Sequence, residues 1–197
     1  MDLKVNNQDV PLTTVSPASF TLSWISKDAT SCTALSTDGI WTGNVIVTGS
    51  RSLNGVVTGT HTYTITCSNQ YESASDSVTV IVVAPLSGTI SVTYARLLLF
   101  APNLGQPAQT LIGTVSGGIS PYSILVWVRT PSGALISLTR SGSTWSVTPD
   151  NSGDLNFGTT EEGIWTAWAD LQDSSGQTYR TASAVWEVAW HPVHGRP

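Results

Sequence analysis

The sequence predicts an all-β protein in which two antiparallel β-sandwiches follow each other along the chain. Apolar and polar residues alternate in short runs, and turn-forming residues separate these runs about every 8–12 positions. No segment shows the 3.6-residue apolar period of a surface helix. Charged residues make up 11% of the 197 positions, against roughly 25% in a typical globular chain. Ser, Thr, Asn and Gln must therefore solvate the surface, which suits strands with hydroxylated outer faces.

The clearest pattern lies between Thr62 and Val83. Tyr63, Ile65 and Cys67 alternate with threonines, a polar loop follows, and alternation returns before Ala84-Pro85. Alternation of this kind is typical of a strand with one buried and one solvent-exposed face. Two such strands separated by a polar loop predict a β-hairpin.

The remainder of the first 84 residues is consistent with a sandwich of short strands. Asp38-Gly39 and Asn54-Gly55 are predicted turns, and Pro11 to Pro17 is predicted to be an irregular edge. Strands are expected at Leu3–Val5, Phe20–Trp24 and Cys32–Ala34, with one or two more within Ile40–Ser52.

The second half repeats this organisation without cysteines. Strands are expected within Thr89–Phe100, Thr110–Val115, Ile124–Arg129, Ala134–Thr139, Thr144–Thr148, Ile164–Leu171 and Tyr179–Trp190. The last two form a hairpin that corresponds to Thr62–Val83, which indicates a weak internal repeat. The expected organisation is a first domain at 1–84, a short Pro-containing linker at 85–88, a second domain at 89–190 and a tail at 191–197.

The only two cysteines, Cys32 and Cys67, leave two interpretations. They are either buried free thiols or a disulfide. A disulfide closing a loop of this length stabilises a fold by roughly 3–4 kcal/mol in the chain-entropy model, and it implies an oxidising compartment.

Four segments in the first half resemble bacterial immunoglobulin-like repeats. They are TLSW (Thr21 to Trp24), DATSC (Asp28 to Cys32), TYTITC (Thr62 to Cys67) and ASDSVTVIV (Ala74 to Val82). The resemblance covers residues 2–83 and extends more loosely over 88–190. In true immunoglobulin domains, a tryptophan lies between the two cysteines and a tyrosine lies two residues before the second cysteine. Here Trp24 precedes both cysteines, and Tyr63 lies four residues before Cys67.

This resemblance implies an immunoglobulin-like fold, a Cys32–Cys67 disulfide and a place in a large exported surface protein. It implies no particular binding site. An extracellular or cell-surface location follows as an expectation, with any export signal absent from this chain.

Charge and hydropathy exclude several classes of partner. The net charge of −5 argues against nucleic acid and anionic membranes, which attract basic surfaces. No apolar run approaches the roughly 20 residues of a membrane span, so membrane insertion is not expected.

Catalytic and cofactor motifs are also missing. The three histidines are His61, His191 and His194, and no nucleophile-elbow or phosphate-loop motif accompanies them. Neither an enzyme nor a cofactor is expected. The best calcium candidate runs from Asp150 to Glu161, but Leu155 stands where a calcium loop needs glycine, so a plain polar loop is preferred.

Tryptophan is the unusual element of the second domain, which holds six of the eight in the chain. The positions of Trp165 and Trp168 are three residues apart, an odd number, so on one strand the two side chains must point to opposite faces. Either these strands are central, long or twisted, with their ends covered by loops, or they carry an apolar outer patch that meets another surface. The candidate contact face comprises Leu97, Leu99, Trp127, Trp165, Trp168, Trp186 and Trp190.

Together these features predict a non-catalytic structural or assembly module of a bacterial surface protein, adhesin stalk or extracellular fibre. It would act through contacts with other protein domains or copies of itself. The alternative is a carbohydrate-binding or substrate-targeting module, in which glycans stack on aromatic rings near Asp170, Asp173 and Arg180.

Overall fold

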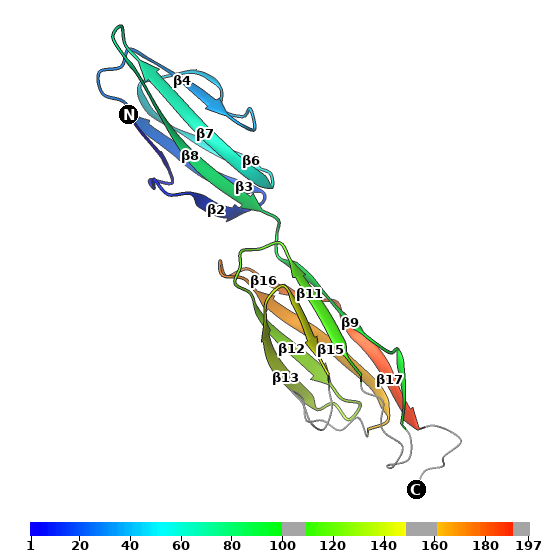
Figure 1. The fold of residues 1–197 in the computed structure, drawn as a ribbon. Coiled ribbons are helices and arrows are strands. Elements are labelled where there is room, and N and C mark those ends of the chain that lie inside the picture. Colours follow the sequence, from blue (N-terminus) through cyan, green and yellow to red (C-terminus); the bar gives the residue numbers. More distant parts are fainter. Residues whose placement is uncertain (100–108, 149–160, 191–197) are drawn as a thin grey trace. The chain divides into compact units, whose positions relative to one another are not determined.

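The computed structural model describes residues 1–99, 109–148 and 161–190. The chain divides into two compact units, Met1–Pro85 and Leu86–Pro197 (Figure 1). Each unit is a sandwich of two β-sheets, and the predicted all-β, immunoglobulin-like fold class is confirmed. The described residues contain no helix, so none of them forms a helix long and apolar enough to cross a membrane.

The first unit contains eight strands. They are β1 (Asp2–Val5), β2 (Leu12–Val15), β3 (Ala18–Ile25), β4 (Ser31–Ser36), β5 (Gly43–Val45), β6 (Thr48–Val56), β7 (Gly59–Ser68) and β8 (Ser73–Val83). One sheet has the order β1-β3-β6 and the other β2-β8-β7-β4-β5. The Thr62–Val83 hairpin forms the middle of the larger sheet.

The second unit repeats this topology. Its strands are β9 (Ser87–Val92), β10 (Arg96–Leu99), β11 (Leu111–Ser116), β12 (Ser123–Arg129), β13 (Leu135–Ser141), β14 (Thr144–Val147), β15 (Gly163–Gln172), β16 (Thr178–Arg180) and β17 (Ala184–Trp190). The smaller sheet has the order β14-β11-β9 and the larger β10-β17-β15-β12-β13, with β16 also paired to β15. In both larger sheets one edge strand, β2 or β10, pairs in parallel with its neighbour.

Inward-facing side chains of both sheets form the core of the first unit. Phe20 contacts Tyr63 edge-on with ring centroids 5.5 Å apart, and Trp24 contacts Trp41 at 5.4 Å. Tyr63 and Trp41 are fully buried. Apolar and polar residues therefore alternate along β3 and β7 because one face of each strand fills the space between the two sheets.

The predicted Cys32–Cys67 disulfide is confirmed. The two cysteines face each other on the neighbouring strands β4 and β7, with Cα atoms 4.0 Å apart. The bond therefore lies within one sheet, whereas the bridge of antibody domains joins the two sheets.

Two predictions in the first unit were wrong. Asn54-Gly55 is not a turn between strands, because β6 continues to Val56. These two residues stand opposite the single Ser19 of β3, and Gly55 has a φ of +72°, as in a β-bulge that keeps Leu53 and Val56 buried. The segment expected to be irregular contains the edge strand β2.

Along the sequence, the second unit begins at Leu86, within the linker expected at 85–88. Leu86 is 6% exposed and belongs to the core of the second unit, and β9 begins at Ser87. Gly88 could not be larger, since a Cβ there would lie 2.6 Å from the Thr114 carbonyl oxygen. These residues are therefore part of the second sandwich.

Candidate functional site

The outer face of the larger sheet in the second unit carries the most unusual surface of the described residues. Its side chains come from alternate positions of β12, β13, β15, β16 and β17, whose places are visible in Figure 1. The register sets Trp127 opposite Trp168 and Leu125 opposite Asp170. Arg180 in turn lies opposite Asp170, and Arg129 lies between Thr166 and Leu135.

Trp127 and Trp168 stack on this face. Their ring centroids are 6.3 Å apart and their planes differ by 20°. Arg129 and Arg180 place their guanidinium carbons 5.7 and 5.8 Å from the centroid of Trp168. Both tryptophans are half-buried.

Asp170 joins these groups. It accepts two hydrogen bonds from Arg180, at 2.6 and 2.9 Å, and one from the indole Nε1 of Trp127 at 2.9 Å. The hydrogen bond from Arg180 lowers the pKa of Asp170 and outweighs the opposing effect of burial. Asp170 therefore orients the indole of Trp127 and the guanidinium that covers Trp168.

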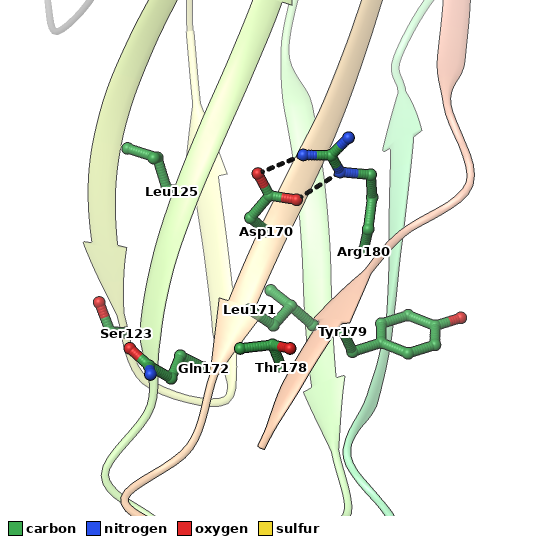
Figure 2. A pocket seen from close by; sticks show the side chains of 8 residues that line it. All are labelled: Ser123, Leu125, Asp170, Leu171, Gln172, Thr178, Tyr179 and Arg180. Carbon is green, nitrogen blue, oxygen red and sulfur yellow. Dashed lines mark hydrogen bonds and ion pairs between the residues drawn. The ribbon is translucent and has the colours of Figure 1, made fainter. Parts of the chain in front are cut away.

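A hollow of about 520 Å³ opens beside this network. Figure 2 shows Ser123, Gln172 and Thr178 gathered near the ends of their strands, with Leu125 and the Asp170–Arg180 pair beyond them. The ring of Tyr179 points away from this group. The hollow is thus lined by hydroxyl, amide and paired charged groups, with aliphatic surface from Leu125.

The structure separates the predicted contact face into two sets. Leu97, Trp165 and Trp186 are 2%, 1% and 1% exposed and lie in the core, so assigning them to a contact face was wrong. Trp165 and Trp186 stack inside the sandwich with centroids 5.8 Å apart. The small Ala167 and Ala169 follow on the inner face of β15, which leaves room for these two rings.

Trp127 and Trp168 are the members of the predicted set that lie on the outer face of the larger sheet. Leu99 and Trp190 belong to β10 and β17, but their side chains lie outside the described part of the chain. Sequence inspection missed Arg129, which lies two positions after Trp127 on the same face. Strand alternation could have identified it once Trp127 was known to point outward.

The calcium candidate falls mostly outside the described residues, which resume at Glu161. A carboxylate oxygen of Glu161 accepts a hydrogen bond from Ser132 at 3.1 Å. Within residues 1–99, 109–148 and 161–190, no three His, Cys, Asp or Glu side chains converge as a metal site would require. His191 and His194 also fall outside the described residues.

The first unit holds one buried polar cluster. The hydroxyl of Tyr63 donates to Asp38 at 2.6 Å, and His61 Nδ1 lies 3.3 Å from the same carboxylate. Burial raises the pKa of Asp38, but hydrogen bonds from Ser36, Tyr63 and the backbone of Ile40 outweigh it and lower the pKa overall. Burial and then the Asp38 carboxylate raise the pKa of Tyr63. The buried cluster joins β7 to the turn after β4.

No protein-family model and no curated protein matches the chain. Solved structures with a similar fold include the fibronectin(III)-like modules of Clostridium thermocellum CbhA, at 11% identity and a TM-score of 0.38, over 100% of this chain and 98% of that one. A tetra-tandem repeat from the extending region of a large adhesion protein is 20% identical with a TM-score of 0.43, over 95% of this chain and 49% of that one. Domains A168–A170 of titin are 11% identical with a TM-score of 0.48, over 95% and 66%. The chain thus spans about half the length of the adhesion-protein structure.

Proposed function

We propose that this chain is a non-catalytic structural or assembly module of an exported bacterial surface protein, such as an adhesin stalk or an extracellular fibre. It acts through protein contacts made by the outer face of the larger sheet in the second unit. The stacked Trp127–Trp168 pair with its two arginines is the observation that carries the proposal. Trp and Arg are the residue types most enriched at the energetic centres of protein interfaces.

The disulfide supports the proposed location. Disulfides form and persist in oxidising compartments, and Cys32–Cys67 accounts for both cysteines of the chain. The acidic net charge of −5 supports a protein partner over nucleic acid.

Light scattering over a range of protein concentrations tests this contact face. The wild type should associate, and a Trp127→Ala/Trp168→Ala variant should remain monomeric because the interface loses its two largest side chains. Circular dichroism establishes that the variant is folded. A matched control, Thr62→Ala/Thr64→Ala, removes two outer-face side chains of the first unit and should associate as the wild type does. A strictly monomeric wild type at high concentration would contradict association through this face.

A second candidate function is glycan binding, and the hollow beside Asp170 and Arg180 is the observation that favours it (Figure 2). Stacking of a sugar on Trp168 is disfavoured, because Arg129 and Arg180 both lie over that ring. A sugar would instead meet Ser123, Gln172 and Thr178. A glycan array probed with the wild type and with a Gln172→Ala/Thr178→Ala variant tests this candidate, which predicts that only the wild type binds strongly. If no glycan binds, or if both proteins bind equally, glycan binding in this hollow is ruled out.

A further inference from the structure

The tip of the β7–β8 hairpin in the first unit presents an exposed aromatic ring beside a carboxylate. Tyr71 is 86% exposed, the most among the exposed large apolar residues of the described chain. Glu72 follows it and is also exposed. Within the described part of the chain, none of the ion pairs involves Glu72. The tip therefore combines apolar area with one unpaired negative charge.

Hydrogen bonds hold this tip in shape. The side-chain oxygen of Asn69 accepts from the backbone N–H groups of Tyr71 and Glu72, at 2.8 and 3.0 Å. Its amide nitrogen donates to the carbonyl of Asp28 at 2.9 Å. A preorganised loop loses less conformational entropy when it binds than a loose one.

The outer face of the second unit offers the complementary chemistry around Arg129. This side chain is exposed, and its interaction among the described residues is with the ring of Trp168. Two more cations of the described part of this sheet are already paired, Arg96 of the edge strand β10 with Glu187 and Arg180 with Asp170. Among the described residues, Arg129 is thus the cation of this face that is available to an incoming carboxylate.

Exposed apolar side chains lie near Arg129 on the same face, with Thr166 between Arg129 and the further strand β17. Leu135 and Val185 lie in the same cross-strand row and are 48% and 50% exposed, and Ile164 on β15 is 57% exposed. With adjacent strands about 4.8 Å apart, Leu135 and Val185 are separated by about 14 Å across the sheet. This patch, formed by Arg129, Leu135, Ile164 and Val185, is wide enough for one aromatic side chain and its neighbour.

We propose that the Tyr71–Glu72 tip of one copy docks on the Arg129 patch of a second copy. The Glu72 carboxylate pairs with the Arg129 guanidinium, and the Tyr71 ring covers the apolar side chains beside it. The contact joins two different surfaces, so a pair of copies still has one free patch, on the copy whose tip is docked, and one free tip, on the other copy, for further copies. This inference rests on the proposed assembly function and names its partner as the chain itself.

Charge reversal tests this pairing directly. Sedimentation equilibrium should show about tenfold weaker association for Glu72→Arg and for Arg129→Glu, because each places like charges in contact. The double variant Glu72→Arg/Arg129→Glu restores the opposite signs and should recover most of the wild-type affinity. Tyr71→Ala should weaken association without affecting the fold, since the ring is exposed.

A matched charge reversal away from both surfaces provides the control. Arg51→Glu on β6 changes the net charge as Arg129→Glu does and should leave association unchanged. Single variants that associate like the wild type, or a double variant that stays weak, overturn the pairing. If Trp127→Ala/Trp168→Ala nevertheless abolishes association, the outer face of the second unit is still the contact face, but its partner is a surface other than the Tyr71–Glu72 tip. If the wild type is monomeric throughout, this docking and any other self-association through the outer face are overturned, and the proposed function is left only with contacts to a different protein.

Discussion

Asp173 anchors the turn between β15 and β16 in the second unit. It is 5% exposed and accepts hydrogen bonds from the backbone of Ile119 at 2.8 Å and from the hydroxyl of Ser175 at 2.7 Å. Gln177 donates from both its backbone and its side chain, at 2.9 and 2.7 Å. Burial raises the pKa of Asp173, but these donors outweigh it and lower the pKa to about 2.

This carboxylate predicts a loss of stability in acid. Its pKa is lower in the folded chain than the value of 3.8 expected when unfolded, so its contribution is complete above about pH 4 and disappears as pH falls towards 2. The contribution is on the order of 2 kcal/mol. Asp173→Asn should therefore destabilise the second unit near neutral pH and much less at pH 2. Hydrogen exchange with mass spectrometry measures this for peptides of that unit, and an equal loss at both pH values would contradict it.

At the scale of single strands, β11 shows how a small residue accommodates a large one. Gly113 pairs with Trp145 of β14, and a Cβ at Gly113 would collide with the indole ring. Trp145 is 6% exposed and belongs to the core. The glycine is therefore required by the close approach of this ring.

Gly113→Ala is expected to destabilise the second unit by about 1–3 kcal/mol, because the added methyl group must displace Trp145 or the strand backbone. Ile112→Ala, one position earlier on the same strand, is a suitable control because Ile112 is 49% exposed. Urea unfolding followed by tryptophan fluorescence gives both free energies. A Gly113→Ala variant as stable as the control would mean that the core has room to adjust.

Strand alternation made most of this architecture predictable. The β7–β8 hairpin, the two cores and the corresponding β15–β17 segment all follow from residues that alternate between an apolar and a polar face. Alternation also established that Trp165 and Trp168 point in opposite directions, but it did not say which one points inward. That choice depends on the opposite sheet and on small neighbours such as Ala167, which sequence spacing does not reveal.

The candidate site was only partly predictable for the same reason. Asp170 and Arg180 were expected near the tryptophans because they share a hairpin. Their bidentate pairing and the position of Arg129 over Trp168 depend on register between strands that are distant in sequence. The bulge at Asn54-Gly55 was mistaken for a turn because both structures favour glycine with positive φ.

At the scale of the whole molecule, the described residues form two separate hydrophobic cores, and the chain has one disulfide. One core is built from residues between Leu3 and Val82, and the other from residues between Leu86 and Val188. Cys32–Cys67 closes a loop with a sequence separation of 35 in the first unit alone. The constraint that this bond places on the unfolded chain therefore concerns the first core only.

Reduction should consequently destabilise one unit and leave the other unchanged. In the chain-entropy model, opening the loop lowers the free energy of unfolding of the first unit by roughly 3–4 kcal/mol. Hydrogen exchange in the presence and absence of a thiol reductant should show faster exchange in β4 and β7, with no change in β12 and β15. A Cys32→Ala/Cys67→Ala variant should reproduce this pattern without reductant. Equal acceleration in both units would show that their stabilities are coupled, and no acceleration would show that the disulfide adds little to the first core.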